Sequence, residues 1–141
     1  MTANDVRVPH GTAAWFEMVG TLMCEAASWA GLSPDYSVSV VERYTDGVEL
    51  SDGLVQGLRF EIIGGKPTFR VGARQDQRAD ITIEITAAAS RELITLHSAD
   101  PIYQNALSNF LSTGAMRVDG DPTRLGGWMS AVHDAIVDRT S

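Results

Sequence analysis

Three short stretches carry the strongest structural signal in the chain: Leu58-Arg-Phe-Glu-Ile-Ile63, Pro67-Thr-Phe-Arg-Val71 and Ala79-Asp-Ile-Thr-Ile-Glu-Ile85. In each of them apolar residues alternate with polar ones, which is the pattern of a β-strand with one buried face and one face toward water. Gly64-Gly65 stands between the first two stretches and can supply the positive φ angles of a tight hairpin turn. We therefore predict three strands, the first two joined as a hairpin.

The sequence changes its period after these strands. Residues 87–96 are rich in helix formers, and Asp100-Pro101 and Asp121-Pro122 each have the composition of a helix start. The aspartate can accept the orphan amide hydrogens of the first turn, and proline has no amide hydrogen to lose there. We predict that one helix begins at Pro101 and that the last helix runs from Pro122 to Arg139. Between them, Gly114 ends the first helix, and a short strand contains Met116 and Val118.

Apolar residues recur three and four apart near the start of the chain, at Trp15, Val19, Leu22, Met23, Ala26 and Trp29. This spacing predicts a helix over about residues 12–31, which Gly31 and Pro34 would end. Residues 38–45 form a further strand candidate, and Asp46-Gly47 and Asp52-Gly53 are turn signals. Together the elements predict an α/β (α+β) domain, in which helices pack on one face of a five-stranded, mostly antiparallel sheet.

Composition narrows the classes of partner. The 141 residues are the size of one domain, here residues 1–141, and carry a formal net charge of −7. An acidic surface repels phosphate backbones, so we expect no nucleic-acid partner. No apolar run approaches the roughly 20 residues that span a bilayer, so we expect no stable membrane insertion. No secretory signal is visible and Cys24 is the single cysteine, which together favour a cytoplasmic location.

Motifs that bind nucleotides or activate a nucleophilic serine are absent from the sequence. The histidines, His10, His97 and His133, are not spaced as zinc ligands. We therefore expect neither a metal nor a cofactor. Asp80, Glu61 and His133 are weak candidates for acid–base chemistry, because a carboxylate or an imidazole could act as a general base if it faced a cavity.

Two phrases resemble the sterol carrier protein-2 superfamily. They are Ala79-Asp-Ile-Thr-Ile-Glu-Ile-Thr86 and Leu111-Ser-Thr-Gly-Ala-Met-Arg-Val-Asp-Gly-Asp121. In the second phrase a helix end, a glycine, an alternating strand and Gly-Asp before a helix follow one another, as in that family. The resemblance covers about residues 38–137. It implies a hydrophobic cavity between sheet and helices, and non-covalent binding or transfer of a lipid, a sterol, a fatty acyl group or a similar apolar small molecule.

The side chains that we expect to line this cavity are Phe60, Phe69, Ile83, Tyr103, Leu107, Phe110, Met116, Trp128, Met129 and Val132. An ordinary filled core is the alternative interpretation of the same residues. A small hydrophobic-pocket enzyme of the isomerase or cyclase type is the competing function. It requires a carboxylate or a histidine that points into the cavity, whereas a purely apolar wall favours a carrier.

The sequence says less about how a ligand would enter and about the oligomeric state. We expect the last helix to act as the lid, because Gly126-Gly127 would weaken its first turns by roughly 1 kcal/mol per glycine relative to alanine. A firmly docked core helix is the alternative. The sequence leaves a homodimer open.

Overall fold

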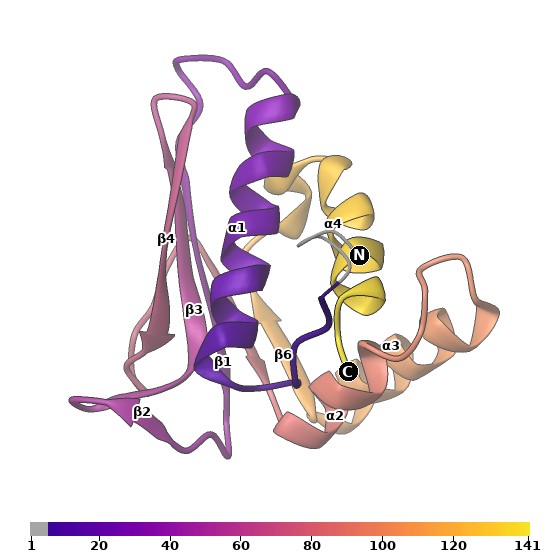
Figure 1. The fold of residues 1–141 in the computed structure, drawn as a ribbon. Coiled ribbons are helices and arrows are strands. Elements are labelled where there is room, and N and C mark those ends of the chain that lie inside the picture. The colour runs from indigo at the N-terminus through magenta and orange to yellow at the C-terminus, as the bar shows by residue number, and fades with distance from the viewer. Residues whose placement is uncertain (1–5) are drawn as a thin grey trace.

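The computed structural model describes residues 6–141 as a sheet with helices on one side of it (Figure 1). The strands are β1 (Val38–Tyr44), β2 (Glu49–Ser51), β3 (Leu54–Ile63), β4 (Lys66–Ala73), β5 (Ile81–Ile85) and β6 (Met116–Asp119). The helices are α1 (Ala13–Trp29), α2 (Ala87–Leu93), α3 (Pro101–Thr113) and α4 (Trp128–Asp138), with a 3₁₀ turn, η2 (Pro122–Leu125), before the last of them. The α+β class is as predicted.

The six strands form one mixed sheet in the order β2-β3-β1-β5-β6, with β4 also paired to β3. Every pairing is antiparallel except the one between β1 and β5, which is parallel. The two hairpin turns that join β2 to β3 and β3 to β4 have positive φ angles at Asp52-Gly53 and Gly64-Gly65, as the sequence predicts. The five predicted strands are present, and the three-residue strand β2 is an addition between two turn signals.

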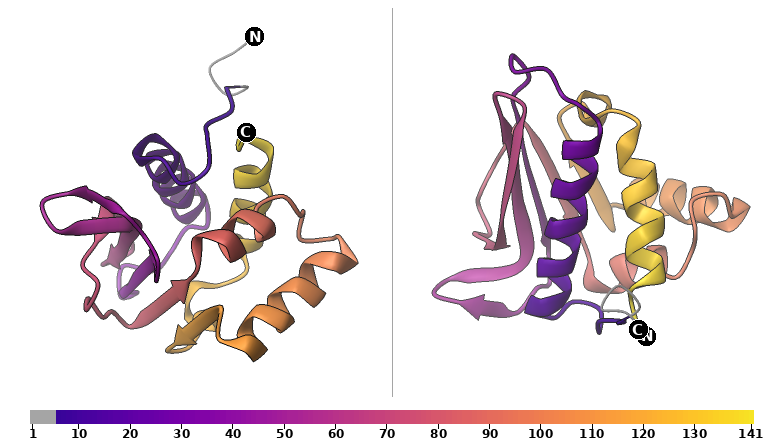
Figure 2. Two further views of the ribbon diagram at one scale, coloured as in Figure 1. Left: turned by 90° about the horizontal axis from the view of Figure 1, so that it is seen from below. Right: turned by 45° about the horizontal axis from the view of Figure 1, so that its top comes forward.

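The sheet has one apolar face and one polar face. Leu58, Phe60 and Ile62 of β3 are buried under the helices. The opposite face carries ion pairs, in which Arg43 lies 3.2 Å from Glu84 and Arg78 lies 2.6 Å from Asp119. Strand alternation therefore directs all helix packing to a single side of the sheet, where α1 and α4 lie side by side (Figures 1 and 2).

Two predictions about the helices are wrong. Trp29, assigned to the apolar stripe of the first helix, is 90% exposed at the end of α1. The predicted helix from Pro122 to Arg139 is interrupted, because Gly126 adopts φ 90° and ψ 176°, outside the helical region. Gly126-Gly127 therefore precede α4 instead of weakening its first turns, and Asp121 caps only the 3₁₀ turn by accepting the amide hydrogen of Thr123.

The last helix is anchored at its C-terminal end. The amide of Val8 donates to the carbonyl of Arg139 at 2.8 Å, and the amide of Ser141 donates to the carbonyl of Val8 at 3.0 Å. The indole N–H of Trp15, in α1, donates to Thr140 Oγ1 at 2.9 Å. These bonds hold the C-terminal end of α4 against α1 and against the segment before α1 that contains Val8.

We predict that Gly20→Ala destabilises the fold even though alanine is the better helix former. A methyl group at Gly20 would overlap the ring of Phe69 where α1 crosses β4. Overpacking of this kind typically costs about 1–3 kcal/mol of unfolding free energy, measurable by urea denaturation. Gly127→Ala is the matched control, because nothing lies within 4 Å of a methyl group there. Equal stability of the two variants would contradict the close helix–sheet approach.

Candidate functional site: a pocket between the sheet and the helices

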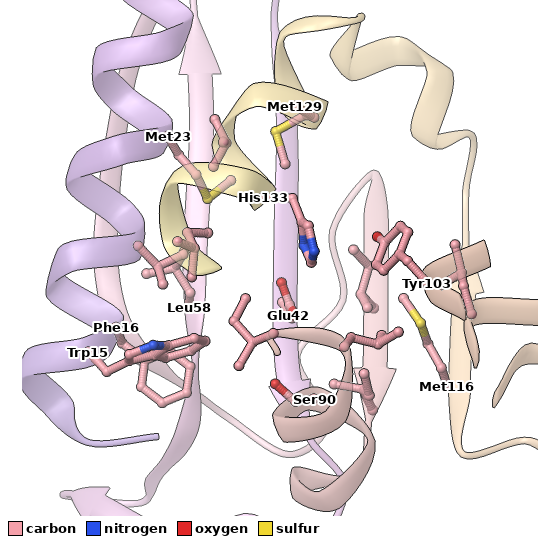
Figure 3. A pocket seen from close by; sticks show the side chains of 18 residues that line it. Trp15, Phe16, Met23, Glu42, Leu58, Ser90, Tyr103, Met116, Met129 and His133 are labelled. Atoms are coloured by element: carbon pink, nitrogen blue, oxygen red, sulfur yellow. The ribbon is translucent and has the colours of Figure 1, made fainter. Parts of the chain in front are cut away.

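A pocket of about 170 Å³ lies between the apolar face of the sheet and the helices (Figure 3). Its wall receives side chains from all four α-helices and from β1, β3, β5 and β6. Most of the lining is aliphatic, aromatic or methionine. Four polar side chains interrupt it: Glu42, Ser90, Tyr103 and His133.

Six of the ten predicted ligand-binding residues line this pocket: Ile83, Tyr103, Leu107, Met116, Met129 and Val132. The other four, Phe60, Phe69, Phe110 and Trp128, are absent from its lining. Phe60 is buried and packs against Trp128 with ring centroids 6.2 Å apart. Phe69 covers Gly20, and Phe110 packs on the outside of the core cluster. Of these four rings only Phe60 is fully buried, and the other three pack against the core beside it.

The three candidate acid–base residues lie in different places. His133 lines the pocket, and its Nε2 donates to the carbonyl of Leu96 at 2.8 Å. Asp80 lies at the start of β5, where its carboxylate accepts the amide hydrogen of Ser39 at 3.0 Å. Glu61 is exposed on the polar face of β3, opposite Ser39 and Thr68. Asp80 and Glu61 therefore do not face the pocket.

Glu42 is the carboxyl group that sequence reasoning missed. It lies on β1 between Val40 and Tyr44, on the apolar face, and its neighbours in register are Leu58 and Ile83. Within residues 6–141, its carboxylate makes no hydrogen bond and no ion pair, and burial raises its pKa. Figure 3 shows its oxygen atoms in the middle of the pocket. The signal was available, because alternation along the predicted strand puts residue 42 on the same face as residues 38, 40 and 44.

A second polar group closes one end of the pocket and is satisfied internally. Ser90 Oγ lies 2.9 Å from the Tyr44 hydroxyl and 3.1 Å from His10 Nε2, and Tyr44 lies 2.9 Å from the same nitrogen. Burial, with a smaller contribution from Arg91, lowers the pKa of His10 to about 4, so the imidazole is neutral at physiological pH. The hydrogen-bonding capacity of Ser90 is thus used within the protein.

Comparisons with known proteins identify the fold. No protein-family model matches the sequence, and no curated protein matches it. A crystal structure of sterol carrier protein 2 superposes with a TM-score of 0.52 at 14% identity, covering 94% of this chain and 99% of that one. Two further structures superpose with TM-scores below 0.5. A conserved hypothetical protein from Thermus thermophilus, described as possibly sterol carrier protein, has a TM-score of 0.47 at 16% identity, covering 96% of this chain and 93% of that one. The UbiJ-SCP2 ubiquinone synthesis protein has a TM-score of 0.44 at 16% identity, covering 92% of this chain and 96% of that one.

The class of structure is therefore an α+β domain with a pocket under its sheet. More particularly, the chain has a sterol carrier protein-2-like fold. None of the helices in the described part of the chain combines the length and the apolar character needed to cross a bilayer.

We predict that Glu42→Met raises the free energy of unfolding at pH 8. A carboxyl whose pKa is raised in the folded state opposes folding once the pH exceeds its unfolded value, because ionisation then costs more in the folded protein. Removing the unpartnered group should gain about 1–3 kcal/mol at pH 8 and less at pH 5, measurable by urea denaturation. Glu61→Met, on the exposed polar face, is the matched control for the change of side chain. A loss of stability at both pH values would contradict the unpartnered state of Glu42.

Proposed function

We propose that this protein binds an apolar small molecule non-covalently in the pocket and releases it again. The observation that carries the proposal is the predominantly apolar wall between sheet and helices. Burial of apolar ligand surface contributes on the order of 25 cal/mol per Å², so such a wall gives affinity without a metal or a covalent bond. The similarity of the fold to that of sterol carrier protein 2 also supports this proposal.

The size of the pocket restricts what it can hold in this conformation. An engineered apolar cavity of about 150 Å³ accepts benzene, whereas sites for drug-sized ligands occupy about 300–1,000 Å³. At about 170 Å³, this pocket has room for a molecule of benzene size or for one segment of a longer chain. A sterol or a long acyl chain requires an element of the wall to move outward.

We propose helix α3, in place of the last helix, as the lid of the pocket. It has no buried residue, and Ile102 and Leu111 on it are 60% and 47% exposed. It contacts mainly α2 and β6 and lies farthest from α1 (Figures 1 and 2). By contrast, α4 buries Val132, Ile136 and Val137. Displacing α3 therefore exposes less apolar surface than displacing α4.

The two ends of α3 suit a hinged movement. At its C-terminal end, Gly114 has φ 84°, a left-handed conformation that glycine adopts without strain. The loop before its N-terminal end is tied to α4, because the amide and hydroxyl of Ser98 donate to the two carboxylate oxygens of Asp134 at 2.7 and 2.8 Å. We propose that α3 swings about these two points to admit the ligand.

Leu107→Trp should lower the affinity for a benzene-sized ligand by tenfold or more. Leu107 lines the pocket from α3, and an indole at this position would occupy the space that the ligand needs. Calorimetric titration of toluene into the purified protein measures the effect, and circular dichroism checks the fold. Leu111→Trp is the matched control, because Leu111 is on the same helix but is exposed outside the pocket. Saturable binding that Leu107→Trp leaves unchanged would place the ligand elsewhere.

Hydrogen exchange followed by mass spectrometry should locate the lid. We expect the amides of α3 to exchange faster than those of α1 and α4 in the free protein, because few buried contacts oppose opening of α3. A saturating apolar ligand should slow exchange in α3 more than elsewhere. Faster exchange in α4 than in α3 would return the role of lid to the last helix.

Catalysis is the weaker candidate function. Glu42 meets one requirement of an acid–base enzyme, a carboxyl with a raised pKa inside an apolar pocket. His133 lines the same pocket, but its Nε2 proton is engaged by Leu96, and neither a hydrogen bond nor an ion pair joins His133 to Glu42 in the described residues. Binding needs only the apolar wall, so we propose binding and treat Glu42 as part of ligand selection.

A further inference from the structure

The polar side chains of the pocket differ in whether other protein groups satisfy their hydrogen bonds. Ser90 is held by Tyr44 and His10, and His133 Nε2 by the carbonyl of Leu96, whereas the hydroxyl of Tyr103 makes no hydrogen bond within the described residues. The carboxyl of Glu42 has no partner in the described part of the chain, although it lies between Leu58 and Ile83 on the apolar face of the sheet and lines the pocket. A buried carboxyl without a partner is costly, so it marks the position where a ligand group would be most strongly stabilised.

We propose that the ligand of this pocket carries a hydrogen-bond-donating group, a hydroxyl or an amine, that pairs with Glu42, and that anionic amphiphiles such as fatty acids are excluded. This inference rests on the proposed function. The apolar wall would bind the body of such a molecule, and the donor would satisfy the one carboxyl that the described part of the fold leaves open. A charge-assisted hydrogen bond to a carboxylate is about twice as strong as a neutral one.

The exclusion of anions follows from the charges around Glu42. None of the described residues that line the pocket is a lysine or an arginine, so an anionic ligand group would be buried without a counter-charge. It would also lie near a carboxyl that repels it whenever Glu42 is ionised. Arg43, the next residue on β1, is turned to the opposite face of the sheet, where it pairs with Glu84. The net charge of −7 opposes the approach of anions from solution as well.

Hydroxyl and amine ligands differ in their expected dependence on pH. The titratable groups that face or adjoin Glu42 are Tyr103 from α3, His133 from α4 and Tyr44 on its own strand. Helix α2 adds Ser90, behind which lie His10 and Arg91, whereas α1, β3, β5 and β6 contribute only apolar lining. An ammonium ligand needs Glu42 ionised, so its affinity should rise with pH until Glu42 is fully charged. A hydroxyl ligand can donate to an ionised carboxylate or to the carbonyl oxygen of a protonated carboxyl, so its affinity should depend less on pH.

Four ligands of similar size test the inference: toluene, benzyl alcohol, benzylamine and benzoate, each titrated calorimetrically into the purified protein. The variants are Glu42→Met, which removes the polar group, and Glu42→Gln, which keeps an acceptor but no charge. We expect Glu42→Met to weaken benzyl alcohol and benzylamine by about tenfold or more and to leave toluene unchanged or tighter. Glu42→Gln should weaken only benzylamine to that extent. Glu61→Met, the control on the polar face, should change none of the four affinities.

The outcomes separate this inference from the proposed function. If toluene binds saturably but Glu42→Met alters all ligands equally, or if benzoate binds the unaltered protein as tightly as benzyl alcohol does, the inference is wrong and the proposed function stands. If none of the four compounds binds, both are contradicted. A loss of benzyl alcohol and benzylamine binding in Glu42→Met, with toluene binding retained, supports both.

Discussion

The structure depends on burial of one face of a single sheet. Strand alternation places Leu58, Phe60 and Ile62 on the same side, and only a second layer can remove that surface from water. Helix α1 provides most of the cover for β3 and β4, where Gly20 allows it to approach the ring of Phe69 closely. Over β1, β5 and β6 the second layer is made by side chains from all four helices, and the pocket lies between these side chains and the sheet.

The buried face of the sheet carries few polar side chains, and these differ in whether other residues satisfy their hydrogen bonds. The hydroxyl of Tyr44 lies within hydrogen-bonding distance of Ser90 and His10, so burying it leaves no open hydrogen bond. Two positions earlier on the same strand, Glu42 receives no such support from the described residues. Tyr44 and Glu42 point to the same face of β1. They differ in that α2 supplies a hydrogen-bond partner, Ser90, to Tyr44 and none to Glu42.

Much of the architecture could be predicted from the sequence because its signals are local. Period-two alternation located β3, β4 and β5, and the Asp-Pro pair before α3 marked its start correctly. The break before α4 could not be predicted from helix formers alone, since it depends on the φ angle that Gly126 adopts in three dimensions. The pocket lining was harder for a related reason. Periodicity shows which side of a strand or helix is buried, but Phe60 and Ile83 occupy equivalent faces, and only packing decides which of them fills the core.

The bond between His133 and Leu96 links the pocket wall to the segment that leads into α3. Nε2 of His133, whose ring lines the pocket, donates a hydrogen bond of 2.8 Å to the carbonyl of Leu96, at the start of the 96–98 loop. A ligand that turned this imidazole toward itself would free the Leu96 carbonyl and loosen the approach to α3, while Asp134 still held Ser98. Rotation of this one side chain would in this way change how firmly the loop before α3 is held to α4.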